Sequence, residues 1–142
     1  MKLAHATLVT AGILAVAAVT PLYSGKSAAA QPGLYTAAQA ATGAKDYAQN
    51  CSRCHGVNLE GVSAPPLKGS DFSGVPGGSG KLTIHDIFKY MTSLMPAGNA
   101  GSLSHDTYAA IMAYILKENG SPAGSTALTY AAAMKSTLPI KK

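Results

Sequence analysis

The feature that most constrains this 142-residue chain is its single pair of cysteines, Cys51 and Cys54, followed at once by His55. Two thiols three positions apart with a histidine next to the second form the C-x-x-C-H pattern of covalent c-type haem attachment. At the end of a helix, the two sulfurs can reach the vinyl groups on one edge of a porphyrin, and the imidazole can bind the iron. The pattern therefore predicts a fold that surrounds one covalently attached cofactor.

Two other interpretations of these residues stay open. A thioredoxin-like redox pair also has C-x-x-C spacing, but it needs the strand–helix context of a parallel sheet. A zinc site needs a fourth ligand, for which His85 and His105 are candidates, although neither has the spacing of a zinc ligand. Two cysteines are too few for a disulfide scaffold or a four-cysteine zinc site.

The first thirty residues predict an export signal. Lys2 supplies a positive start, and an apolar stretch follows over residues 8–19. Residues 28–30 are three alanines, which suit a cleavage site, so that the mature chain would begin at Gln31. The alternative is an uncleaved anchor, but the apolar stretch is shorter than the ~20 residues that a spanning helix needs.

We therefore expect a cleaved signal peptide over residues 1–30 and one domain over residues 31–142. The domain core should cover about residues 40–120, with an extension at each end. No segment after the signal is apolar enough to span a bilayer, so we expect a periplasmic protein without a stable membrane span.

The composition limits the classes of partner. The formal net charge is +5 before the signal is removed, a bias too weak to indicate nucleic-acid binding. Lys68, Lys81 and Lys89 flank the segment expected near the cofactor and could steer an acidic redox partner, although scattered solvated lysines are an equal alternative. With no Trp and two Phe, the core has few bulky aromatic side chains, and a buried porphyrin would supply the missing apolar volume.

Hydrophobic spacing and capping residues predict an all-α fold with three main helices. The first should cover residues 36–50, the second should begin at residue 83 and end before Pro96, and the third should cover residues 104–119. A further short helix is expected over residues 127–134. Residues 56–82 are rich in Gly and Pro and are expected to be irregular, without a strand.

Over about residues 40–120 the chain resembles the monohaem class I cytochromes c of bacteria. Gly43 and Tyr47 match the Gly-x-x-x-aromatic pattern of that family's N-terminal helix. Residues 114–116 (Tyr-Ile-Leu) match the aromatic–aliphatic stretch of the C-terminal helix that crosses it. Residues 64–67 (Ala-Pro-Pro-Leu) are similar to its Gly-Pro-x-Leu segment, with alanine in place of the usual glycine.

The resemblance implies a class I cytochrome c fold, in which helices and irregular loops surround one haem c joined by thioethers to Cys51 and Cys54. It implies His55 as one axial ligand of the iron, with the carbonyl of Pro65 accepting a hydrogen bond from it and orienting the ring. It also implies Met95 as the other axial ligand, because Met95 precedes a proline in the loop ahead of the last helix.

Met91 competes with Met95 for that role. It lies one turn earlier, on the apolar stripe of a predicted helix with Ile87 and Phe88, so we expect it to fill the core. His85 and His105 lie at predicted helix starts, where we expect both to be exposed, and ligation of the iron by two histidines is disfavoured.

The sequence therefore predicts a periplasmic one-electron carrier rather than an enzyme, since it holds no acid–base pair or nucleophile arrangement. The alternative is a cytochrome c subunit of a periplasmic dehydrogenase or oxidase complex, which relays electrons from a catalytic partner and could use the extensions as docking segments. A periplasmic dehydrogenase or a terminal oxidase is a candidate redox partner. A haem-based gas binder would need an open iron site, which Met95 would fill.

Overall fold

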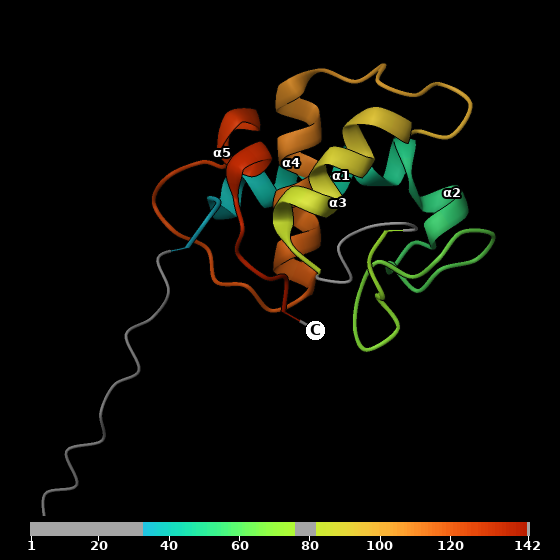
Figure 1. The fold of residues 1–142 in the computed structure, drawn as a ribbon, viewed down its shortest axis with the longest axis horizontal. Helices are drawn as coiled ribbons and strands as arrows, with labels where there is room; N and C mark the ends of the chain where they lie inside the picture. The colour runs from blue at the N-terminus through green and yellow to red at the C-terminus, as the bar shows by residue number, and fades with distance from the viewer. Residues whose placement is uncertain (1–32, 76–81, 142) are drawn as a thin grey trace, which may run out of the picture. The chain divides into compact units, whose positions relative to one another are not determined.

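The computed structural model describes residues 33–75 and 82–141. These residues form helices only, apart from one isolated β-bridge. The predicted all-α class is therefore confirmed, whereas the predicted signal peptide over residues 1–30 lies outside the described residues. In chain order (Figure 1), the helices are α1 (Ala37–Asn50), α2 (Ser52–His55), α3 (Ile84–Leu94), α4 (His105–Glu118) and α5 (Tyr130–Lys135).

The three long helices begin where the sequence predicts, because each has a side-chain cap. The hydroxyls of Thr36, Thr83 and Ser104 each accept a hydrogen bond from the backbone N–H three residues later. Helix α3 ends at Leu94, ahead of Pro96, since a proline disfavours helical geometry at the preceding residue.

Two short helices differ from the prediction. Helix α5 begins at Tyr130 instead of residue 127, because the hydroxyl of Thr129 caps it by accepting from the N–H of Ala132. Helix α2 was not predicted as a separate element. At Cys51, φ is −128° and ψ is −33°, which interrupts α1 and leaves the C-x-x-C-H motif on a turn of its own.

Helices α1 and α4 cross in the most extensive helix–helix contact of the described residues (Figure 1). Gly43 lies at the crossing, where a Cβ atom would overlap the backbone carbonyl of Ala110. One turn later, the ring of Tyr47 packs against that of Tyr114, with centroids 5.3 Å apart. The missing side chain at residue 43 therefore allows the two backbones to approach closely.

The extensions outside residues 40–120 pack against the core and against each other. Tyr35 is buried, and its hydroxyl donates a 2.6 Å hydrogen bond to the carbonyl of Ser121. The side-chain amide of Gln39 donates to the carbonyl of Leu128 at 2.7 Å and accepts from its N–H at 2.8 Å. Both extensions are therefore part of the folded unit.

The end of the chain also holds the start of α3. The N–H of Ile84 donates to the carbonyl of Leu138, and the N–H of His85 donates to that of Ser136, both at 3.0 Å. Ile140 is buried and donates its N–H to the carbonyl of Leu82 at 2.8 Å. Helix α3 is thus fixed by a segment more than forty residues later in the chain.

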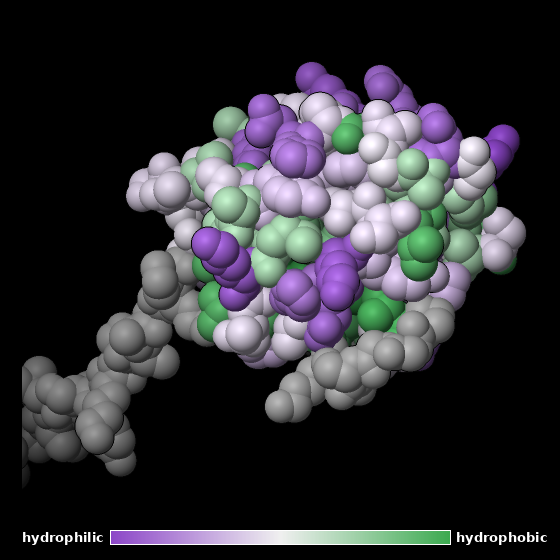
Figure 2. Space-filling view, turned by 45° about the horizontal axis from the view of Figure 1, so that its top comes forward, coloured by the Kyte–Doolittle hydropathy of each residue, from purple (hydrophilic) through white to green (hydrophobic). Residues whose placement is uncertain are grey.

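The surface carries both polar and apolar side chains. On the face shown in Figure 2, hydrophilic and hydrophobic residues are interspersed. The large exposed hydrophobic side chains lie in the loop after α2, at the end of α3 and near the end of the chain: Val57, Val62, Leu94 and Leu138. No helix in residues 33–75 or 82–141 has both the length and the hydropathy needed to cross a bilayer.

The α1–α4 crossing predicts an unusual response to Gly43→Ala. In an ordinary helix this change stabilises by up to about 1 kcal/mol. Here the new methyl group would meet the backbone of Ala110, so we expect the free energy of unfolding to fall by about 1–3 kcal/mol. Thermal denaturation followed by far-ultraviolet circular dichroism measures this. Ala41→Ser, at an exposed position of the same helix, serves as the control and should change stability by no more than about 0.5 kcal/mol.

Candidate functional site

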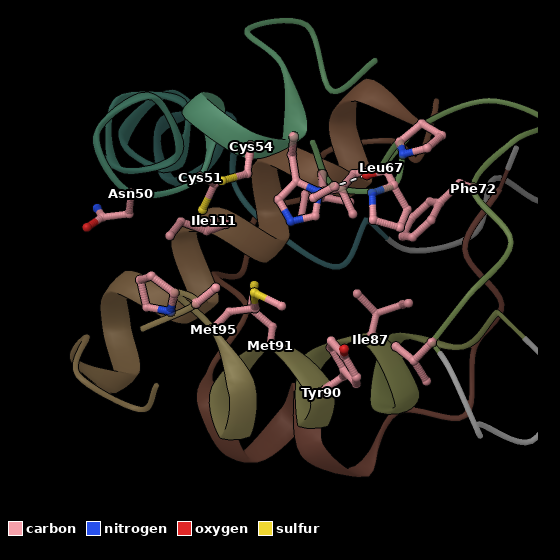
Figure 3. Close-up of a pocket in the computed structure, with 18 of the residues that line it drawn as sticks. Asn50, Cys51, Cys54, Leu67, Phe72, Ile87, Tyr90, Met91, Met95 and Ile111 are labelled. Atoms are coloured by element: carbon pink, nitrogen blue, oxygen red, sulfur yellow. Dashed lines mark hydrogen bonds between the residues drawn. The ribbon is translucent and has the colours of Figure 1, made fainter. Parts of the chain in front are cut away.

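A cavity of about 530 Å³ lies between α2, the loop that follows it, α3 and α4. Its walls are mainly apolar, and its size is that of a typical small-molecule or cofactor site. Figure 3 shows Cys51 and Cys54 on one side of it, with Met91 and Met95 on the other, at the end of α3. The structure therefore brings residues from distant parts of the sequence to one cavity.

All five site residues expected from the sequence line this cavity: Cys51, Cys54, His55, Pro65 and Met95. The cysteines and the histidine come from the single turn of α2 and the residue before it. Pro65 belongs to the irregular segment after α2, and Met95 is the C-cap residue of α3. The arrangement thus places two thiols and an imidazole together, with a thioether available from a second element.

Backbone hydrogen bonds fold the segment after α2 back onto the motif. The carbonyl of Cys54 accepts from three successive N–H groups, those of residues 62–64, at 3.0–3.1 Å. The carbonyl of His55 accepts from the N–H of Gly61 at 2.7 Å, and the carbonyl of Gly56 accepts from the buried hydroxyl of Tyr47 at 2.7 Å. These bonds bring the following residue, Pro65, beside the imidazole.

The orientation of His55 follows from this fold. Its Nδ1 lies 2.8 Å from the carbonyl oxygen of Pro65. A carbonyl can only accept, so Nδ1 carries the proton of this hydrogen bond and Nε2 keeps its lone pair. The imidazole is therefore prepared to bind a metal through Nε2.

The environment of the cysteines does not suit a redox pair. Burial, together with the nearby Cys54, raises the pKa of the Cys51 thiol to about 11. Thioredoxin-like pairs need a lowered thiol pKa because the thiolate is the reacting form. The described ranges also contain no sheet on which a thioredoxin-like site could stand.

The zinc interpretation lacks a fourth ligand. His85 and His105 do not line the cavity. His105 is exposed, as expected, and its ring stacks on that of Tyr130 with centroids 3.7 Å apart. The expectation that His85 is exposed was wrong, because its Nδ1 hydrogen-bonds the carbonyl of Met134 and the residue is half-buried. In residues 33–75 and 82–141, no three His, Cys, Asp or Glu side chains are grouped to hold a metal ion.

The two methionines occupy different positions at the cavity. Met91 lies within α3, is 7% exposed and belongs to the hydrophobic core. Met95 lies just outside the helix in extended backbone, with φ −119° and ψ 153°, and is half-buried. Its carbonyl accepts a 2.7 Å hydrogen bond from the hydroxyl of Tyr108 in α4.

Among the lining residues that were not identified from the sequence are Arg53, Phe72 and Tyr90. Tyr90 lies three residues after Ile87 and one before Met91, so that helical spacing alone would have placed it on the cavity face. Arg53 lies between the cysteines and is exposed. Its position inside the motif does not indicate which residues its side chain lies against. Phe72 comes from the irregular segment, where no periodicity exists to place it.

The lysines expected to flank the site do not lie at the cavity where the structure describes them. Lys68 is half-buried and Lys89 is exposed, and neither lines the cavity. Lys81 lies outside the described residues. Arg53 is the basic residue that the structure places at the cavity.

The residues present fit a c-type haem. Two thiols lie on one turn, the adjacent imidazole has its Nδ1 proton engaged by a carbonyl, and thioether sulfurs come from the opposite wall. Apolar side chains from α3 and α4 supply the dry walls that a porphyrin requires: Ile87, Ile111 and Ile115.

Comparisons with known proteins agree with this fit. Residues 38–115 match the family model described as cytochrome C oxidase, cbb3-type, subunit III. The chain is 38% identical to cytochrome c-551 of Bacillus subtilis over 86 residues, which are 61% of this chain and 69% of that protein. It is also similar to a chain in the crystal structure of the sulfane dehydrogenase SoxCD from Paracoccus pantotrophus. That match has 32% identity and a TM-score of 0.53, and covers 78% of this chain but only 56% of the other.

The three interpretations of Cys51 and Cys54 predict different thiol counts for the purified protein after denaturation. Thioether attachment consumes both cysteines, so we expect no reactive thiol with or without reductant, and an intact mass greater by one haem. Two thiols appearing only after reductant would indicate a disulfide, and two appearing with a chelator alone would indicate a metal site. In the Cys51→Ser, Cys54→Ser double variant, the cofactor should separate from the chain on denaturation.

Proposed function

The chain belongs to the monohaem class I cytochrome c family, and we propose that it is a periplasmic one-electron carrier whose iron is held by His55 and Met95. The family assignment makes one covalent haem c the cofactor, and the haem supplies the one-electron couple between ferrous and ferric iron. The observation that carries the proposal is the shared cavity, with the C-x-x-C-H turn on one side and Met95 on the other.

The first proposed axial ligand is the imidazole of His55, and its hydrogen bond to the chain determines its orientation. The hydrogen bond from Nδ1 of His55 to the carbonyl of Pro65 fixes the tautomer and the ring orientation, and it makes Nε2 a stronger donor to the metal. Because Pro65 contributes its backbone carbonyl, the arrangement depends on the path of the loop more than on the side chain at that position.

On the second axial side, Met95 fits the ligand role better than Met91. Met95 is outside the helix and half-buried at the cavity, where it packs against the edge of the core without being part of it. Met91 is part of the buried stripe of α3, where a flexible apolar side chain fills space between neighbours. A thioether ligand favours ferrous iron and raises the reduction potential.

The proposed location rests on residues 1–30, which have the composition of an export signal. A domain that begins at Gln31 would keep every described element, since the described residues start at residue 33. Both extensions are then part of the mature protein. Attachment of c-type haem in bacteria takes place outside the cytoplasm, in agreement with this location.

A second candidate function is an electron-relay subunit of a larger redox enzyme. The similarity to a chain of a sulfane dehydrogenase favours it, although this chain spans only 56% of that one. In either role the protein passes electrons between partner proteins and catalyses no reaction of its own. Gel filtration of the protein from its native host separates the two, because a carrier runs as a small monomer and a subunit elutes with a larger chain.

Axial ligation is tested by ultraviolet–visible redox titration of Met95→Ala beside Met91→Ala. If Met95 binds the iron, Met95→Ala should lose the weak red absorption band of the iron–sulfur bond and lower the reduction potential, because the thioether that favours ferrous iron is gone.

Met91→Ala is the matched control, since it removes a thioether from the same cavity wall. It should keep the red band and instead destabilise the protein by about 2–5 kcal/mol through the cavity it leaves in the core. Loss of the band in Met91→Ala alone would transfer the ligand role to Met91.

A further inference from the structure

We infer that Tyr108 is a positioning residue for the axial methionine, holding the backbone of Met95 at the cavity from α4. The inference rests on the proposed ligation by Met95. The hydroxyl of Tyr108 donates a 2.7 Å hydrogen bond to the carbonyl oxygen of Met95, across thirteen residues of sequence. Tyr108 does not line the cavity, so it acts on the iron site only through Met95.

The loop after Met95 gives the side chain little support of its own. Residues 97–102 are all exposed. Their backbone hydrogen bonds lie within the loop, as in the bond from the N–H of Asn99 to the carbonyl of Pro96. A loop of this kind can open at small cost, so the position of Met95 depends on how its two ends are fixed.

Helix α4 holds one of these ends, the one at Met95, against the core. Tyr108 is 2% exposed and lies in a helix whose residues are buried along most of its length. One turn further along the same helix, Ile111 forms part of the cavity wall. A bond from Tyr108 to Met95 therefore sets the distance between the methionine and the wall against which the haem would lie.

The carbonyl of Met95 has a second donor, the N–H of Gly101, at 3.1 Å. This bond belongs to the loop and moves with it, whereas the bond from Tyr108 comes from the core. Removing the hydroxyl of Tyr108 should therefore leave a loop that still closes but is open in a larger fraction of the molecules. A partly buried neutral hydrogen bond of this kind shifts such an equilibrium by about fivefold to tenfold.

The fraction of protein in which the loop is open can be measured by titrating exogenous imidazole into the ferric protein at fixed pH. Imidazole binds the iron only where the methionine has left, so its apparent affinity is proportional to the open fraction. Tyr108→Phe should bind imidazole about fivefold to tenfold more tightly than the wild type, with the red band present before imidazole is added.

Tyr35→Phe is the matched control. Tyr35 is also 2% exposed, and its hydroxyl also donates to a backbone carbonyl, that of Ser121, at 2.6 Å, but it does not line the cavity or touch Met95. It should lose similar stability with an unchanged imidazole affinity. An equal increase in both variants, or in neither, would overturn the role of Tyr108.

Two further measurements keep the test decisive. If Tyr108→Phe does not load haem, Tyr108→4-fluorophenylalanine fills the space of the hydroxyl without donating a hydrogen bond, and it should show the same tighter binding. The red band of the wild type separates this inference from the proposed function. If the wild type lacks the band, or Met95→Ala retains it, ligation by Met95 has failed. If the band depends on Met95 but Tyr108→Phe binds imidazole like the wild type, only the inference about Tyr108 has failed.

Discussion

The close approach of α1 and α4 at Gly43 is the contact on which the rest of the structure depends. Helix α1 leads directly into Cys51 and α2, so its position against α4 determines where the haem-binding turn stands. One turn beyond the crossing, the buried hydroxyl of Tyr47 donates to the carbonyl of Gly56, at the end of that turn. Burial raises the pKa of this hydroxyl, which keeps it protonated and able to donate. The position of His55 therefore depends on how α1 and α4 cross.

Helix α4 then supports both sides of the cavity, that of His55 and that of Met95. At its C-terminal end, the buried amide of Asn119 donates to the carbonyl of Leu67 at 2.9 Å and accepts from the N–H of Gly69 at 3.2 Å. These bonds fix the segment that continues from Pro65, the hydrogen-bond acceptor for the imidazole. Near its other end, Tyr108 holds Met95. A buried amide or hydroxyl left unpaired would cost free energy, so both side chains favour a single path for the loops they hold.

The features that could be predicted from the sequence are those determined locally. The caps at Thr36, Thr83 and Ser104 act within three residues, and the C-x-x-C-H spacing acts within five, so both were visible in the chain. The sequence did not predict features that arise when distant segments meet. The burial of His85 comes from a segment almost fifty residues later, and the bond from Tyr108 to Met95 has no counterpart in any motif. Tertiary contacts of this kind leave no periodic pattern.

The same distinction between local and long-range contacts applies within the site. The imidazole of His55 is held by Pro65, ten residues away, through a loop that folds back on its own turn. Met95 is held by the hydroxyl of Tyr108 in α4, thirteen residues away, and through α3, whose start is fixed by residues 136–140. Helix α4 supports the other side as well, because Asn119 holds the carbonyl of Leu67, two residues after Pro65. Long-range contacts are lost together when elements separate, so separation of α4 from the core would release the supports of Met95 and of Pro65 in one step.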